Sequence, residues 1–183
     1  NVITYTGYTF EEIINEMEIN HSWKELLLAT DILIDGKFDI NKKSLLLKFR
    51  GSKNQRIIDV LLIYADLEHG NNFEYLVGFL PRFEEALLVF HKDQKAYLVM
   101  GNENLNKVSK ARLQCKAIHA PYFSLPNQPM NNTKSFKDIM KETDIENKRI
   151  GVVGWKNFTS LYEDNRQLYD IPVFIMDALI ELC

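Results

Sequence analysis

The chain has 183 residues, of which 46% are hydrophobic and 26% charged, so it is long and apolar enough to bury the core of a globular protein. Its formal net charge of -3 gives no reason to expect nucleic acid or an anionic membrane as a partner, and no apolar run approaches the roughly 20 residues that span a bilayer. The two cysteines, Cys115 and Cys183, form no C-x-x-C pair, which is typical of a reducing compartment, and we expect a cytoplasmic protein.

The chain opens with a pattern that predicts one strand and two helices. Residues 2–5 are rich in β-forming side chains. Thr9 is followed by Glu12 three residues later, which is the capping pattern that begins a helix. Ser22 and Glu25 repeat this pattern, so a second helix is predicted to begin there.

A second strand and a long polar loop follow. Residues 31–34 predict a strand that ends at the turn pair Asp35 and Gly36. Residues 41–55 are rich in Lys, Ser, Asn and Gly and predict a basic loop. Residues 1–56 are therefore expected to form a β-α-α-β segment of their own.

The next part of the chain changes to longer apolar runs. Residues 57–64 are almost continuously apolar, as in a strand covered on both faces. Residues 73–79 predict a short helix closed by Gly78. The apolar runs 86–90 and 96–100 flank a polar stretch and predict a β-hairpin.

The rest of the chain alternates between helices and strands. In chain order we expect a helix over 103–113, a strand over 117–119, a loop over 121–133, a helix capped by Ser135 and Asp138, a strand over 149–155 and a final helix beginning near Pro172. Such alternation favours an α/β sandwich with a mixed sheet. The predicted second domain covers residues 57–183.

Two groups of polar residues could bind ligands. Arg50, Lys53 and Arg56 surround Gly51 and Ser52 and could cradle a phosphate, but short basic runs are more often solvated loops.

The second group is Asp66, Glu68 and His69, which follows the buried strand of residues 57–64. A loop after a strand of an α/β sheet is where ligands tend to bind, and these side chains could hold a metal ion. Three polar residues in one loop more often make turn and cap hydrogen bonds, so we expect no metal site.

From about residue 58 onward, the chain carries an ordered series of motifs. They are DLEHGNNFEYLVGF at 66–79, PRFEEALL at 81–88, GNEN at 101–104, FSLP at 123–126, IGVVGW at 150–155 and DIP at 170–172. This series resembles the creatinase/prolidase N-terminal domain, which precedes the catalytic domain of Xaa-Pro peptidases of the M24 metallopeptidase class.

That resemblance implies an accessory module with a mixed-sheet α/β sandwich of the creatinase N-terminal type. Such a module positions the catalytic domain, restricts substrate access and supports oligomerisation, so the implied partner is an M24 catalytic domain or a second copy of the chain. The family's two divalent metal ions are bound in the catalytic domain. By the resemblance, Asn71, Tyr75, Arg82 and His69 are the expected substrate or inter-subunit contacts.

The first segment is similar to a different family. YTGYTFEE at 5–12, ILIDGKF at 32–38 and FRGSKNQR at 49–56 resemble the C-terminal part of anaerobic ribonucleotide reductase activating proteins, which are radical SAM enzymes. The resemblance implies a fragment of a partial barrel in which Thr6, Gly7 and Asp35 lie at strand ends on the SAM side.

The radical SAM chemistry depends on a 4Fe-4S cluster held by three closely spaced cysteines. No cysteine precedes Cys115, so we expect no cluster in this chain, and turn formation is the expected role of Thr6, Gly7 and Asp35 here.

Neither segment contains a complete catalytic constellation, so we assign no catalytic or metal-ligating residue and expect no cofactor in the chain alone. The leading hypothesis is a non-catalytic N-terminal module of an Xaa-Pro metallopeptidase. The alternative is a truncated radical SAM activating protein of anaerobic ribonucleoside-triphosphate reductase. A third possibility is an unnatural fusion without a selected function.

Overall fold

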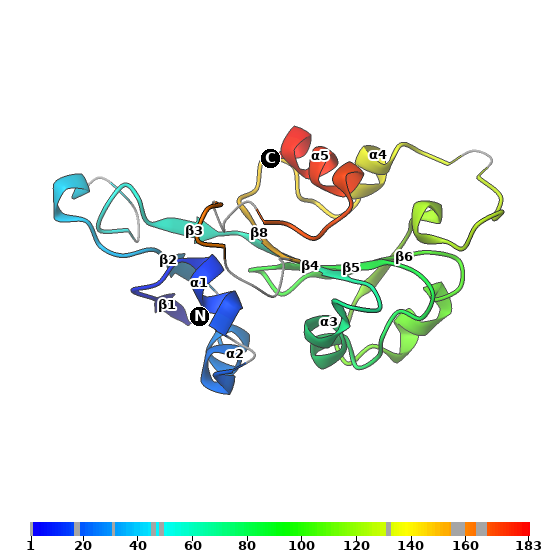
Figure 1. The fold of residues 1–183 in the computed structure, drawn as a ribbon, viewed down its shortest axis with the longest axis horizontal. Coiled ribbons are helices and arrows are strands. Elements are labelled where there is room, and N and C mark those ends of the chain that lie inside the picture. Colours follow the sequence, from blue (N-terminus) through cyan, green and yellow to red (C-terminus); the bar gives the residue numbers. More distant parts are fainter. Residues whose placement is uncertain are drawn as a thin grey trace. The chain divides into compact units, whose positions relative to one another are not determined.

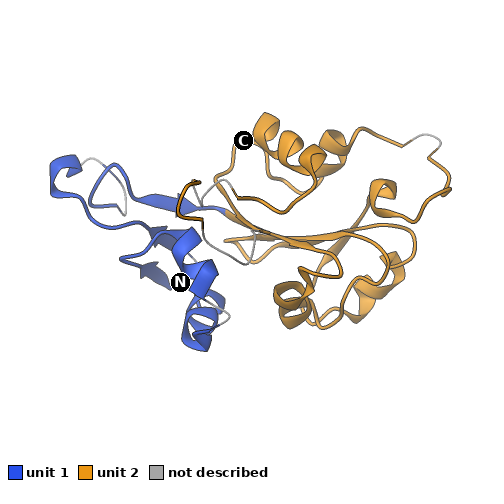
Figure 2. Cartoon of the chain, in the orientation of Figure 1, with its two compact units in different colours: residues 1–59 blue, residues 60–183 orange. Residues whose placement is uncertain are grey.

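The structure is a computed structural model that describes residues 2–16, 19–30, 32–44, 47, 50–130, 133–154, 160–163 and 168–183. It divides into two compact units, Asn1–Asp59 and Val60–Cys183 (Figure 2). Each unit combines helices with a sheet that contains both parallel and antiparallel strand pairs, which confirms the predicted α/β class.

The first unit contains a three-stranded sheet. Strands β1 (Ile3–Tyr5), β2 (Ile32–Asp35) and β3 (Arg56–Ile58) lie in that order, and β1 runs parallel to β2 while β3 runs antiparallel to it. The helices α1 (Phe10–Glu16) and α2 (His21–Leu28) connect the two parallel strands, as a crossover between parallel strands requires.

The predicted capping pattern at the start of α1 is confirmed. The Thr9 backbone N–H donates to Glu12 Oε2 at 2.7 Å, and the Glu12 backbone N–H donates to Thr9 Oγ1 at 3.3 Å. The helix then buries Phe10, Ile13 and Ile14 in the core of the first unit.

The capping prediction for α2 is wrong by two residues. Asn20 is the N-cap, and its side chain accepts a hydrogen bond from the Ser22 backbone N–H at 3.2 Å. Asn20 caps a helix at least as well as Ser22 and comes first in the chain, so the helix begins at His21. None of its residues is fully buried.

The second unit contains a five-stranded sheet. In spatial order the strands are β7 (Lys116–His119), β6 (Ala96–Met100), β5 (Ala86–His91), β4 (Val60–Ala65) and β8 (Ile150–Val153). Strand β5 is antiparallel to both neighbours, while β6 with β7 and β4 with β8 form parallel pairs. The carboxyl ends of four strands therefore lie at one edge of this sheet.

Helices cover both faces of this sheet (Figure 1). The helices α4 (Phe136–Lys141) and α5 (Val173–Leu182) pack against each other, and α3 (Gly70–Val77) packs on β4. Alternate residues of β4 and β5 pack with α4 and α5 in the main hydrophobic core, which contains Leu62, Tyr64, Leu87, Val89, Met140 and Ile175. No helix within the described ranges is long and apolar enough to cross a membrane.

Two predicted elements differ from the structure. The apolar run 57–64 is not one strand, because Asp59 separates β3 from β4 and the two strands belong to different sheets. Periodicity cannot detect such a change when both strands are apolar. The helix predicted over 103–113 is only a 3-10 helix over Leu105–Lys110, because Ala111 is extended and the Arg112 backbone N–H donates to Val77 O instead.

Candidate functional site

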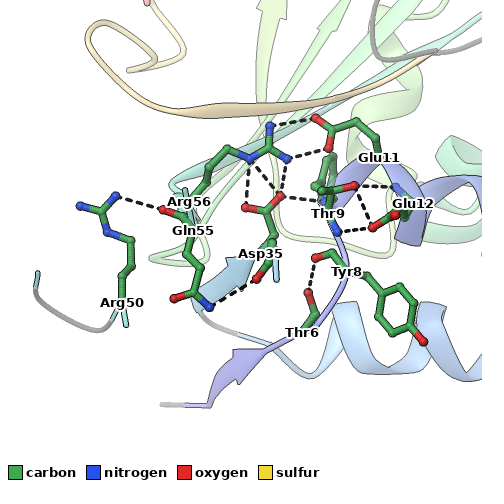
Figure 3. A network of polar contacts seen from close by, with 11 residues as sticks. Thr6, Tyr8, Thr9, Glu11, Glu12, Asp35, Arg50, Gln55 and Arg56 are labelled. Atoms are coloured by element: carbon green, nitrogen blue, oxygen red, sulfur yellow. Dashed lines mark hydrogen bonds and ion pairs between the residues drawn. The ribbon is translucent and has the colours of Figure 1, made fainter. Parts of the chain in front are cut away.

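The carboxyl ends of β1 and β2 bring the predicted residues Thr6, Gly7 and Asp35 to one edge of the first sheet. Figure 3 shows Thr6 and Asp35 there. The Thr6 backbone N–H donates to Ile34 O at 3.1 Å, and Thr6 Oγ1 donates to Tyr8 O at 2.6 Å. A Cβ placed on Gly7 would meet no atom within 4 Å, so a ligand or another chain segment can approach this backbone closely.

Asp35 is completely buried, and both of its carboxylate oxygens accept hydrogen bonds. Its Oδ2 accepts the Phe10 backbone N–H at 2.7 Å, which satisfies one of the free N–H groups at the start of α1. Arg56, which faces Asp35 across the β2–β3 pair, donates from Nε to Oδ1 at 3.1 Å and to Oδ2 at 3.0 Å. Asp35 therefore serves the fold of this unit.

Glu11 completes the ion cluster that we call the Arg56 network, which consists of Glu11, Asp35 and Arg56 (Figure 3). Arg56 Nη1 and Nη2 donate to the two oxygens of Glu11 at 2.9 and 2.6 Å. Hydrogen bonding to Glu11, followed by the influence of Asp35, raises the pKa of Arg56 despite its partial burial. Burial acts to raise the pKa of Glu11, but the hydrogen bond from Arg56 and further contacts lower it overall.

Residues 50–55 of the basic loop fold around the side chain of Gln55. Gln55 Oε1 accepts the backbone N–H groups of Gly51 at 2.8 Å and Ser52 at 3.2 Å, while Nε2 donates to Gly36 O at 3.3 Å. Arg50 Nη1 donates to Gln55 O at 3.1 Å. The amides that a bound phosphate would need are already paired, so the geometry does not favour the phosphate interpretation.

Sequence reasoning did not connect Glu11, Gln55 and Arg56 to Asp35. No local signal indicated this, because it is the pairing of β2 with β3 that places Arg56 opposite Asp35. The network contains no nucleophile with an adjacent general base, so its evident chemistry is to hold the strand ends, α1 and the basic loop together. Phe49, the first residue of one of the motifs, lies outside the described residues.

In the second unit, His69 lies between two carboxylates. Asp66 Oδ1 accepts the backbone N–H groups of Glu68 at 2.8 Å and His69 at 2.7 Å, as predicted for a turn. The His69 ring contacts the same oxygen through Nδ1 at 2.9 Å and Asp170 Oδ2 through Nε2 at 3.2 Å. Tyr64 donates its hydroxyl to Asp66 Oδ2 at 3.2 Å.

These contacts and burial shift the pKa values of Asp66 and Tyr64. Burial acts to raise the pKa of Asp66, but hydrogen bonds from the His69 backbone and ring and from the Glu68 backbone lower it overall. The pKa of Tyr64 is raised, first by burial and then by the negative charge of Asp66 and Glu85. Among the described residues, no group of three or more His, Cys, Asp or Glu side chains could hold a metal ion.

The other predicted contact residues lie on α3 and in the loop that follows it. Asn71 and Tyr75 are exposed one turn apart on the same face of α3, and Arg82 is exposed in the loop before β5. Contact of these side chains with a partner stays a prediction. Trp155, at the end of another motif, lies outside the described residues.

Two buried polar residues support that loop and were not singled out in the sequence. Glu84 Oε1 accepts the Glu103 backbone N–H at 2.8 Å, and Glu84 Oε2 accepts a hydrogen bond from Asn104 Nδ2. Asn104 Nδ2 also donates to Arg82 O at 2.8 Å. Burial is the main cause that raises the pKa of Glu84. The GNEN motif, which supplies both partners of Glu84, was the available signal.

Comparison with known protein families gives a match that covers the first unit. The family model of a 4Fe-4S single cluster domain matches residues 1–58. No curated protein and no solved structure matches the chain significantly. Residues 1–58 are therefore similar to 4Fe-4S single cluster domains.

The residues of the matched segment do not fit a 4Fe-4S cluster by themselves. Such clusters are held by cysteine thiolates, and residues 1–58 contain no cysteine. Cys115 and Cys183 both belong to the second unit, and burial raises the pKa of the Cys115 thiol to about 11, which keeps it protonated at neutral pH. The segment that the family model matches therefore contains none of the cysteines that hold such a cluster.

Proposed function

We propose that the first unit is the cluster-free C-terminal part of a radical SAM activating protein, and that it completes the SAM-side wall of a barrel whose cluster is bound by another segment. The observation that carries this proposal is the meeting of three separate motifs at one strand edge. The 4Fe-4S family match to residues 1–58 supports it independently.

The motifs meet through specific hydrogen bonds. The first motif supplies Glu11 and the Phe10 backbone N–H, the second supplies Asp35 and Gly36 O, and the third supplies Gln55 and Arg56. Because each motif holds the other two, their joint occurrence has a structural reason. Gly7 is an exposed position at this edge, and its backbone has open space for a ligand.

The test is to express the complete reading frame that encodes this chain. We expect a Cys-x-x-x-Cys-x-x-Cys run upstream of Asn1, and we expect the longer protein to take up iron and sulfide under anaerobic conditions and to cleave SAM to 5′-deoxyadenosine. The chain of residues 1–183, assayed in parallel, should do neither, because it lacks three clustered thiolates. A full-length protein that binds no iron, or iron-dependent SAM cleavage by residues 1–183, would contradict the proposal.

A second function is supported for the second unit by the contact between two of its motifs. His69 of the DLEHGNNFEYLVGF motif contacts Asp170 of the DIP motif. Two motifs that define the creatinase-type resemblance therefore meet in the folded unit. We propose that this unit is a non-catalytic module of an M24-like Xaa-Pro peptidase, with Asn71, Tyr75 and Arg82 contacting the catalytic domain or a second copy.

The downstream reading frame tests this second function. We expect it to encode the Asp, His and Glu metal ligands of an M24 domain, and we expect the longer protein to cleave Xaa-Pro dipeptides with manganese. Replacing Tyr75 and Arg82 together by alanine should lower kcat/KM or dimer affinity about tenfold, the loss typical of interface anchors. Lys137→Ala, at an exposed pair with Glu181, is the matched control. Full activity in the Tyr75/Arg82 variant would argue against this assignment.

A further inference from the structure

Residues 37–54 form an arm that extends away from the sheet of the first unit, and we call it the basic arm (Figure 1). The Lys53 backbone N–H donates to Lys42 O at 2.9 Å, which joins the two limbs of the arm. At its base, Asn54 Nδ2 donates to Lys37 O at 2.7 Å. The basic arm therefore has a defined backbone conformation.

The basic arm exposes positive charge that has no partner within the unit. Lys37, Lys43 and Lys53 are exposed, and none of them makes an ion pair in the contacts of the described residues. Lys42 pairs with Asp39 at 3.4 Å, and Asp39 is the only acidic residue in the sequence of the arm. The surface of the arm is therefore strongly cationic.

The helices of the same unit expose the opposite charge. Glu16 ends α1 and Glu25 lies in α2, and both are exposed. In the part of the chain that the structure describes, neither glutamate side chain makes a hydrogen bond or an ion pair. Lys24 is the only lysine or arginine in the sequence between residues 10 and 28. The α1–α2 surface is therefore anionic.

Apolar side chains accompany the charges on both surfaces. On the basic arm, Ile40 is 66% exposed, and Phe38 is exposed beside Gly51. Between α1 and α2, Ile19 is 89% exposed, and Leu28 is exposed at the end of α2. Exposed apolar residues surrounded by charged ones are typical of surfaces that bind other proteins.

A second copy of the chain is the partner that these observations favour. The basic arm and the α1–α2 surface are complementary in charge, and both add exposed apolar side chains. A nucleic acid is less favoured, because Gln55 already pairs the Gly51 and Ser52 amides that a phosphate would need. An anionic membrane would attract the arm but repel a chain whose net charge is -3.

We propose that two copies of the chain associate through the basic arm of each copy and the α1–α2 surface of the other. A two-fold axis forms both contacts at once and closes the assembly as a dimer. Exposed ion pairs contribute little individually, so the dimer is weak and sensitive to salt. This association goes beyond both proposed functions and depends on neither.

The first test is analytical ultracentrifugation of the 183-residue chain at different salt concentrations. Between about 0.01 M and about 1 M salt, the screening length falls from about 30 Å to about 3 Å. The dissociation constant of the dimer should therefore rise about tenfold or more over this range. A chain that stays monomeric at low salt, or a dimer that salt does not weaken, would contradict the proposal.

The second test exchanges the charges of the two surfaces. Lys43→Glu with Lys53→Glu reverses the arm, and Glu16→Lys with Glu25→Lys reverses the helices. Each double variant alone should self-associate about tenfold more weakly than the unchanged protein, because like charges then face each other. An equimolar mixture of the two double variants should associate as tightly as the unchanged protein, because opposite charges meet at both contacts.

The matched control is Lys110→Glu with Lys148→Glu, which changes the net charge equally at exposed positions of the second unit and should leave self-association unchanged. A mixture of the two charge-reversed variants that associates no better than either alone would overturn the proposal. Binding of the arm to a DNA oligonucleotide or to phosphatidylserine vesicles, without self-association, would overturn it as well. The salt dependence of the unchanged protein decides the question if a variant does not fold.

Discussion

Replacing Arg56 by leucine is expected to destabilise the first unit by about 3 kcal/mol, because Asp35 would keep a buried negative charge without its cationic partner. This estimate is at the low end for a broken buried ion pair, since the Arg56 side chain is 38% exposed while that of Asp35 is fully buried. A loss of this size is a large part of the stability of a small domain. Hydrogen exchange of the β1, β2 and α1 amides measures it.

The control for Arg56→Leu is Lys42→Met, which removes an exposed ion pair with Asp39 at 3.4 Å and should cost less than about 1 kcal/mol. The double variant Asp35→Asn with Arg56→Leu should be less destabilised than the sum of the single variants, because the unpaired charge is then absent. Comparable losses for Arg56→Leu and Lys42→Met would show that the Arg56 network does not hold the unit together.

Acid should weaken the same network. Because the pKa of Glu11 is lowered in the folded state, its contribution to stability is present above the ordinary glutamate pKa and is lost as the pH falls through the folded value. Arg56 stays charged throughout, since its own pKa is raised. The effect of Arg56→Leu should therefore be smaller in acid than at neutral pH.

Replacing Asn104 by alanine should destabilise the second unit by about 2 kcal/mol, since the buried Glu84 carboxyl would lose one of its hydrogen-bond donors and Arg82 O would lose another. We expect the loss of protection to concentrate in residues 80–85. Hydrogen exchange of these amides, together with urea unfolding, measures the effect.

Asn102→Ala is the matched control for Asn104→Ala, because Asn102 is exposed and its side chain bonds only other exposed side chains in the described contacts. It should cost less than about 1 kcal/mol. At neutral pH, Asn104→Asp should destabilise the unit more than Asn104→Ala, because the new carboxylate would meet that of Glu84. In acid the destabilisation should be smaller, because Glu84 with its raised pKa takes up a proton first. Equal losses of stability in Asn102→Ala and Asn104→Ala would show that Asn104 does not support this loop.

Local signals in the sequence predicted much of the fold. The capping pattern of Thr9 and Glu12 and the left-handed Gly78 at the end of α3 both predicted helix ends, because these residues act on their own neighbours. The hairpin of β5 and β6 was predictable for the same reason. The change of sheet at Asp59 was not, because which strand pairs with which depends on residues far along the chain.

In the candidate sites too, local contacts were predictable from the sequence and contacts between distant residues were not. The turn at Asp66 was predictable from a local polar cluster. The resemblance placed Thr6, Gly7 and Asp35 at strand ends, but it did not indicate that Arg56 and the Phe10 amide would occupy the Asp35 carboxylate. The contact between His69 and Asp170 joins residues that only the folded second unit brings together, and no pattern of spacing predicts it.

The position of β8 beside β4 affects how the second unit folds during synthesis. Strands β4, β5 and β6 are neighbours in sequence and can pair early, whereas β8 must return from almost the other end of the unit to pair with β4. Pairings between distant segments form slowly. Until residues 150–153 leave the ribosome, β4 is an apolar strand with an open edge, and open edges of this kind are sites of aggregation. Chain termination before β8 should therefore yield insoluble protein.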